Sequence, residues 1–113
     1  MQGKKCETST LTNLKMIVYG KEKLETFVIK HSIAKKAIDR WLQTVEEYKF
    51  KDFNDLKTVF STVDYVGNER YVFNLKGNNY RIITVIAFIG NAIVIRWVGT
   101  HAEYDKINDC STI

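Results

Sequence analysis

Hydrophobic and polar residues alternate through the last third of the chain, and this alternation predicts a small antiparallel sheet. Three stretches carry the pattern and three Gly-Asn pairs punctuate it, at residues 71–75, 80–88 and 93–98 and at 67–68, 77–78 and 90–91. Glycine followed by asparagine suits a two-residue hairpin turn. If the last two pairs form such turns, Asn74 faces Arg81 across the first turn, and Arg81 faces Thr100 across the second.

The same alternation divides the side chains of the predicted sheet between two faces. The apolar face, which we expect to be the core, comprises Phe73, Leu75, Tyr80, Ile82, Ile86, Ile93, Ile95 and Trp97. The opposite face comprises Asn74, Lys76, Arg81, Ile83, Val85, Val94 and Arg96. Helices elsewhere in the chain must therefore pack against the first face.

Residues 16–60 predict the elements of this helical layer. A short strand over 16–19 precedes a helical stripe from Leu24 to His31, and Ser32 is the expected N-cap of a second helix. The buried face of that helix is expected to comprise Ala34, Ala37, Ile38, Trp41, Leu42, Val45 and Tyr48. Asp52 is the expected cap of a short third helix that presents Phe53, Leu56, Val59 and Phe60 to the core.

These elements predict an α+β fold in a single domain. The length of 113 residues suits one core, and we place the domain at residues 16–113. Residues 1–15 show no periodicity, so we expect a disordered extension there, with Met16 as an alternative first residue.

The distribution of charge indicates an anionic partner more clearly than the total does. Half of the net charge of +4 belongs to residues 1–15, whereas residues 70–102 contain four cations and a histidine but no acidic residue. Solvated or salt-bridged cations are the ordinary interpretation of such residues. Their gathering on one acid-free sheet face nevertheless favours binding to a polyanion.

The composition argues against several other classes of protein. The two cysteines, Cys6 and Cys110, lack CxxC spacing, so we expect no disulfide, no metal site and no cofactor. The apolar runs fall well short of the roughly 20 residues of a membrane helix. Residues 1–15 also lack the apolar centre of a signal peptide. We therefore expect a cytoplasmic protein without a membrane partner.

The residues after the last predicted strand contain candidate catalytic groups. Thr100 and Glu103 have capping-box spacing, which predicts a short terminal helix and leaves Tyr104 one turn beyond His101. Imidazole groups transfer protons near neutral pH. A capping role for His101 is equally consistent with the sequence, and packing at the edge of the core explains Tyr104 equally well.

The motifs YVFN, GNxYR and IRxVGTHAEYDKI resemble those of the HigB toxins of bacterial type II toxin–antitoxin systems, over about residues 16–108. The resemblance implies a RelE-like fold, a small twisted antiparallel sheet with N-terminal helices packed on one face and a short C-terminal helix. It implies an mRNA interferase that cleaves translated messages, commonly on the ribosome. It also implies a HigA-type helix-turn-helix antitoxin. The toxin would contact operator DNA only indirectly, through this antitoxin.

The resemblance selects candidate site residues, namely Asn74, Lys76, Arg81, Arg96, His101, Tyr104, Asp105 and Lys106. We hypothesise metal-independent cleavage in which the RNA 2′-hydroxyl attacks the adjacent phosphate. Arg81 would stabilise the transition state, and His101 and Tyr104 would be the general base and acid in either order. Asn74, Lys76, Arg96 and Lys106 would contact the RNA. The alternatives are a non-catalytic RNA-binding module and a degenerate toxin that acts only by binding its antitoxin.

Overall fold

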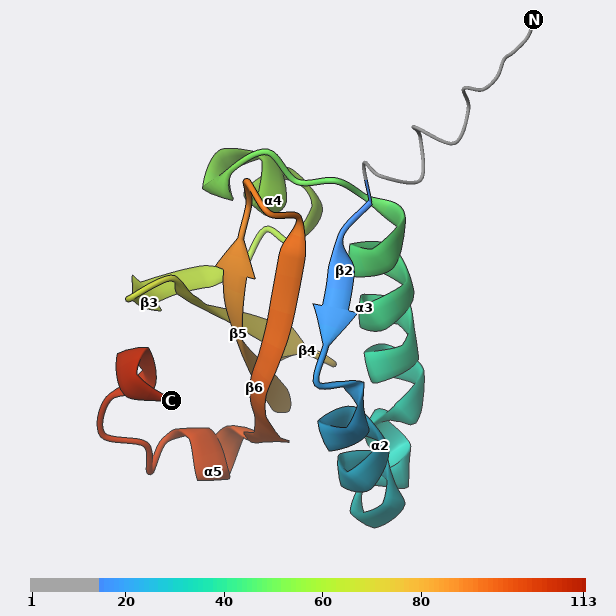
Figure 1. The fold of residues 1–113 in the computed structure, drawn as a ribbon. Helices are drawn as coiled ribbons and strands as arrows, with labels where there is room; N and C mark the ends of the chain where they lie inside the picture. The colour runs from blue at the N-terminus through green and yellow to red at the C-terminus, as the bar shows by residue number, and fades with distance from the viewer. Residues whose placement is uncertain (1–14) are drawn as a thin grey trace, which may run out of the picture.

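The computed structural model describes residues 15–113 as a five-stranded sheet with helices packed on one of its faces (Figure 1). The elements in chain order are β2 (Ile17–Tyr19), α2 (Lys21–Lys30), the 3₁₀ turn η1 (Ser32–Ala34), α3 (Lys35–Glu47), α4 (Phe53–Val59), β3 (Asp64–Gly67), β4 (Arg70–Leu75), β5 (Tyr80–Ala87), β6 (Ala92–Thr100), α5 (His101–Tyr104) and the 3₁₀ turn η2 (Cys110–Thr112). The extension expected at residues 1–15 lies, apart from Lys15, outside the described residues.

The sheet is mixed, which corrects the expectation of an antiparallel sheet. Its strand order is β2-β6-β5-β4-β3, and β2 runs parallel to β6 whereas the other neighbours are antiparallel. A parallel pair needs a long connection, and the whole of α2 to β5 lies between these two strands. The α+β class, with N-terminal helices and a short C-terminal helix, agrees with the sequence-based interpretation.

The register between β4 and β5 is the predicted one, but the register between β5 and β6 is not. Asn74 pairs with Arg81. On the other side Arg81 pairs with Gly99 instead of Thr100, and a further shift occurs between Ile83 and Thr84. The cause is a four-residue connection over 88–91, where we expected two turn residues, together with this irregularity in the strand.

The register shift changes which residues near the end of β6 face the core. Val98 packs against the core cluster, and Trp97, which we expected there, pairs across the sheet with Ile83 outside that cluster. Trp97 lies near Tyr104 instead, with ring centroids 6.3 Å apart. The prediction for Trp97 was therefore wrong, because strict alternation does not survive a bulge.

The helical layer buries most of the predicted apolar positions. Trp41 of α3 packs edge-on against Phe73 of β4, with ring centroids 5.2 Å apart, and Leu56 of α4 is fully buried. Tyr48 is instead 46% exposed, because α3 ends at Glu47 and the chain turns to extended backbone there. Within residues 15–113, no helix is long and apolar enough to cross a membrane.

The predicted helix caps have different outcomes. Asp52 caps α4 by accepting a hydrogen bond from the Asp55 main-chain N–H at 2.9 Å. Ser32 does not cap α3, because residues 32–34 form a 3₁₀ turn that leads directly into that helix. Val59 of α4 is 36% exposed and contributes little to the core.

The opposite face of the sheet carries the C-terminal turn η2. Arg70 Nη2 and Arg96 Nε both donate to the main-chain oxygen of Ile113, each at 3.1 Å. Asn68 Nδ2 donates to the main-chain oxygen of Ser111 at 3.2 Å. The face that we expected to be cationic is thus partly occupied by the chain itself.

Candidate functional site

Arg81 lies at the centre of the candidate site, at the start of β5 and between two neighbouring strands. Its Nη1 donates a hydrogen bond of 2.8 Å to the main-chain oxygen of Asn78. The guanidinium carbon lies 5.1 Å from the centroid of the Tyr104 ring, within the range of a cation–π contact. Because Arg81 is only 7% exposed, these contacts hold the guanidinium in a defined orientation.

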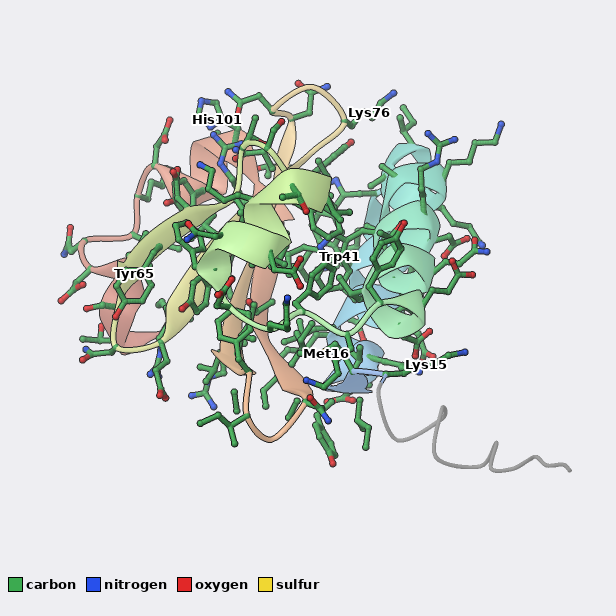
Figure 2. All side chains as sticks on the ribbon, turned by 90° about the horizontal axis from the view of Figure 1, so that it is seen from above. Lys15, Met16, Trp41, Tyr65, Lys76 and His101 are labelled. Carbon is green, nitrogen blue, oxygen red and sulfur yellow. The ribbon has the colours of Figure 1, made fainter. Side chains whose placement is uncertain are left out.

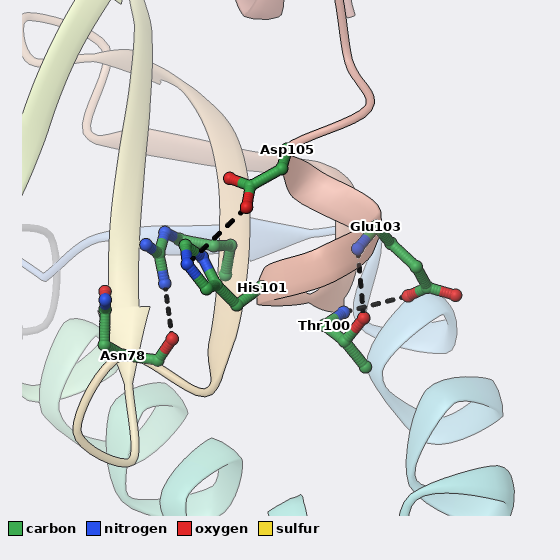
Figure 3. Close-up of polar contacts among 6 residues, drawn as sticks. Asn78, Thr100, His101, Glu103 and Asp105 are labelled. Atoms are coloured by element: carbon green, nitrogen blue, oxygen red, sulfur yellow. Dashed lines mark hydrogen bonds and ion pairs between the residues drawn. The ribbon is translucent and has the colours of Figure 1, made fainter.

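His101 begins α5, and the predicted capping box fixes this helix. The main-chain N–H of Glu103 donates to Thr100 Oγ1 at 3.2 Å, and the main-chain N–H of Thr100 donates to Glu103 Oε1 at 2.9 Å (Figure 3). His101 Nε2 lies 3.6 Å from Asp105 Oδ2, one turn further on. The His101 side chain is 47% exposed, so Asp105 can orient an imidazole that a ligand can still reach.

The turn over residues 76–79 links Arg81 and His101. Asn78 supplies the carbonyl that binds Arg81, and Asn79 supplies the carbonyl that accepts the main-chain N–H of His101 at 2.9 Å. Two consecutive carbonyls therefore anchor the two candidate catalytic residues. The turn needs positive φ at Lys76, Gly77 and Asn78 (50°, 59° and 89°), a conformation that glycine and asparagine adopt more easily than other residues.

Tyr104 is held protonated by its surroundings. Burial, followed by the hydrogen bond with Cys110, raises the pKa of Tyr104 to about 12, although the Arg81 guanidinium acts in the opposite direction. The phenol is therefore neutral at physiological pH. Tyr104 is thus suited to donate a hydrogen bond or a proton, and unsuited to accept one as a phenolate.

The remaining predicted residues are spread around this centre. Lys76 is an exposed residue of the linking turn and lies along the same edge of the molecule as His101 in Figure 2. Asn74 is the neighbour of Arg81 in the sheet, but its Nδ2 donates to the main-chain oxygen of Thr62 at 3.0 Å. Lys106 is exposed just after α5.

Arg96 belongs to a different part of the sheet face. Its Nε donates to the main-chain oxygen of Ile113, as does Nη2 of Arg70. Within residues 15–113, neither of these arginines forms an ion pair with an acidic side chain, and the same holds for Lys76, Arg81 and Lys106. Lys76, Arg81 and Lys106 therefore carry positive charge that no acidic side chain of the described residues pairs with, which favours an anionic ligand.

Sequence reasoning missed several residues that shape the site. Asn78 and Asn79 act through main-chain carbonyls, which no side-chain pattern reveals; the only signal was the Gly-Asn turn itself. Cys110 forms the hydrogen bond that contributes to the raised pKa of Tyr104, and no pattern in the sequence indicates that residues 104 and 110 meet. Arg70 is one of the four cations of residues 70–102, and it was not among the predicted site residues.

This geometry is that of a small α+β protein with a fixed arginine, an accessible imidazole and a neutral phenol at one end of a cationic sheet face. Comparison of the sequence with known protein families places the chain in a class of small toxins. The sequence model of the HigB toxin family, described as the RelE-like toxic component of a toxin–antitoxin system, matches residues 34–107. The chain belongs to this HigB family.

Curated relatives extend the similarity beyond the family model. The chain is 28% identical over 94 residues to the mRNA interferase HigB of Escherichia coli O6:H1, covering 81% of this chain and 91% of the relative. It is 38% identical over 65 residues to the mRNA interferase toxin HigB of Escherichia coli K12, covering 55% of this chain and 62% of that relative. The mRNA interferase HigB of Shigella flexneri matches with the same identity and coverage.

Proposed function

We propose that this chain is the toxin of a type II toxin–antitoxin system and acts as an mRNA interferase, a metal-independent endoribonuclease that cleaves translated mRNA on the ribosome. One observation carries the proposal. In a member of the HigB family, Arg81 and His101 are anchored to consecutive carbonyls of one turn, Asn78 and Asn79. This anchoring supports a site in which a guanidinium and an imidazole act on one phosphate.

The proposed chemistry uses the nucleophile that RNA itself provides. The 2′-hydroxyl attacks the adjacent phosphorus, and the bond from phosphorus to the leaving 5′-oxygen breaks. His101 removes the proton of the 2′-hydroxyl, and Asp105 orients its ring from 3.6 Å. The products would be a 2′,3′-cyclic phosphate and a 5′-hydroxyl.

Arg81 and Tyr104 would act on the negative charge that develops during this step, Arg81 by stabilising it and Tyr104 by protonating the leaving oxygen. The guanidinium, fixed by Asn78 and by the Tyr104 ring, would donate hydrogen bonds to the phosphate oxygens as their negative charge increases. The phenol of Tyr104, whose pKa is raised to about 12, would protonate the leaving 5′-oxygen. The raised pKa thus supports the order of roles that the sequence left open.

The cations around this centre would hold the rest of the RNA chain. Lys76 belongs to the linking turn, Lys106 follows α5, and Arg96 lies further along β6. Single-stranded nucleic acid is commonly bound through such a line of phosphate contacts. Asn74, adjacent to Arg81 in the sheet, would contact the nucleotide next to the scissile phosphate.

The proposed partner is a HigA-type helix-turn-helix antitoxin. The family description of a toxic component within a toxin–antitoxin system supports a neutralising partner. Its helix-turn-helix character and its repression of the operon are part of our proposal. Operator DNA would be contacted by the antitoxin and only indirectly by this chain.

Expression in a bacterial host tests the proposal. Expression of the chain alone should stop growth and convert intact mRNA into fragments with 5′-hydroxyl ends. Co-expression of the protein encoded by the adjoining open reading frame should restore growth. Cleavage of mRNA in a purified translation system, compared with cleavage of the same RNA without ribosomes, tests the requirement for the ribosome.

Metal independence needs a separate measurement of the cleavage rate with a chelator added at the moment of cleavage. The substrate is either RNA that is cleaved without ribosomes or mRNA in isolated stalled ribosomal complexes. The proposed reaction should continue at an unchanged rate.

Intact transcripts at good expression, with normal growth, would contradict the nuclease assignment. Growth arrest without cleavage would instead favour a non-catalytic RNA-binding protein.

A further inference from the structure

A groove separate from Arg81 and His101 runs between α3, α4 and the end of β4. Its volume is about 560 Å³, within the range of cavities that hold ligands or anchoring side chains. Trp41, Phe60 and Leu75 contribute apolar surface to it. Ile33 and Val59 also line it, and they are 72% and 36% exposed. Exposed aliphatic side chains around an apolar floor are typical of a docking site for apolar side chains of a protein.

The rim of this α3–α4 groove is cationic. Lys36, Arg40 and Lys76 line it, and among residues 15–113 no acidic residue does. Within the described part of the chain, none of the three forms an ion pair, whereas Lys35 of the same helix pairs with Asp39. A partner that complements this rim must carry negative charge.

Trp41, which lines the groove, also has an unsatisfied hydrogen-bond donor. The residue is 2% exposed, and its indole Nε1 has no hydrogen-bond partner within residues 15–113. A buried donor without an acceptor is unfavourable. A carboxylate or carbonyl of a bound segment would remove this deficit if the groove adjusts on binding.

We propose that the α3–α4 groove binds an acidic amphipathic segment of the antitoxin. The proposal rests on the proposed function, because it takes the neutralising protein as the partner. RNA fits the groove less well: bases bind by stacking on accessible ring faces, and Trp41 is buried while Phe60 packs edge-on against Phe73. An amphipathic segment matches both the apolar floor and the cationic rim.

Binding in this groove would inhibit the toxin without contact to its catalytic residues. Lys76 and Asn74 line the groove, and both belong to the proposed RNA surface. A docked segment would cover these two residues and leave Arg81 and His101 untouched. Neutralisation would then be competition for the RNA surface, not occlusion of the reacting groups.

The test uses the adjoining protein that restores growth, and measures its affinity for the full chain by calorimetry. Lys36→Glu combined with Arg40→Glu should weaken binding about a hundredfold, since like charges then face the acidic segment, and should flatten the salt dependence. mRNA cleavage by the same variant should be unchanged. Lys49→Glu reverses an exposed cation outside the groove and should alter affinity less than twofold.

A second variant tests the groove by a change that should leave the fold intact. Ile33→Ala shortens a side chain that is 72% exposed, so the fold should be unaffected while affinity falls about tenfold. A photoreactive residue at position 33 should crosslink to an acidic segment of the partner. The inference is overturned if both groove variants bind like wild type, if the crosslink maps to a non-acidic segment, or if cleavage falls while partner binding is unchanged.

The outcomes also separate this inference from the proposed function. A chain that cleaves mRNA but binds the adjoining protein elsewhere overturns the groove assignment and leaves the nuclease intact. A chain that binds the adjoining protein through the groove but does not cleave mRNA supports the groove assignment and overturns the nuclease assignment. A cleaving chain that no adjoining protein neutralises also overturns the groove proposal.

Discussion

Replacing Arg81 by alanine is the most informative single change, because it removes the proposed charge stabilisation. The variant loses the hydrogen bond to the Asn78 carbonyl and the contact with the Tyr104 ring. It also removes a cation from a position that is only 7% exposed, and this relieves a desolvation cost. The change therefore has a catalytic effect and a structural effect, which must be estimated separately.

The catalytic effect should be the larger of the two. Loss of one preorganised group that stabilises developing charge typically costs about 3–4 kcal/mol, a reduction of roughly 10²–10³ in rate. The structural effect is the loss of one charged hydrogen bond, about 1.5–3 kcal/mol, and of the ring contact with Tyr104, about 0.5–2 kcal/mol. Relief of desolvation offsets part of this sum. We expect a net destabilisation of about 1–2 kcal/mol.

The assay is single-turnover cleavage of one message, in parallel with denaturant unfolding of each variant. Arg81→Lys keeps the positive charge but not the planar fork, so it should recover little of the lost rate. Lys49→Ala, at an exposed position away from the site, is the matched control and should cleave at the wild-type rate. Cleavage should be measured at a temperature at which every variant is at least 95% folded.

Two results would refute this reasoning. If folded Arg81→Ala cleaves within about threefold of the wild-type rate, the guanidinium does not stabilise the transition state. If Arg81→Lys restores the full rate, positive charge alone is sufficient, and the fixed geometry provided by Asn78 and Tyr104 has no catalytic role.

Four further variants test the other groups. His101→Gln should slow single-turnover cleavage about 10²–10⁴-fold, because the proposed base is lost; an unchanged rate would leave His101 only a helix-start residue. Tyr104→Phe should slow it about a hundredfold, and because the pKa of Tyr104 is raised to about 12, the wild-type rate should show no loss from phenol ionisation below about pH 10. Arg96→Ala and Lys76→Ala should each reduce the slope of log affinity against log salt by about 0.7; an unchanged slope in both would show that this face does not bind RNA.

The sequence was sufficient where local signals and periodicity agreed. The Asn74–Arg81 pairing, the Asp52 cap and the capping box of α5 follow from turn and cap residues within a few positions of each other. The convergence of Arg81 and His101 was also predictable in outline. It follows from the pairing of three consecutive strands, which short connections enforce.

The errors arose where one residue of register decides the outcome. A four-residue connection and the irregularity between Ile83 and Thr84 moved Val98 into the core and Trp97 out of it. The parallel pairing of β2 with β6 joins segments about 75 residues apart in sequence, and tertiary packing sets such pairings, not local pattern. The contacts of Ile113, just after η2, with Arg70 and Arg96 depend on tertiary placement in the same way.

The candidate site depends on main-chain geometry more than its motif suggests. Arg81 and His101 are positioned by the carbonyls of Asn78 and Asn79, and those carbonyls converge because the turn adopts positive φ at three successive residues. The Gly-Asn pair of the motif therefore has a chemical consequence, since it permits the conformation that presents both carbonyls. A substitution that disfavours positive φ in this turn should impair cleavage without removing any reacting group.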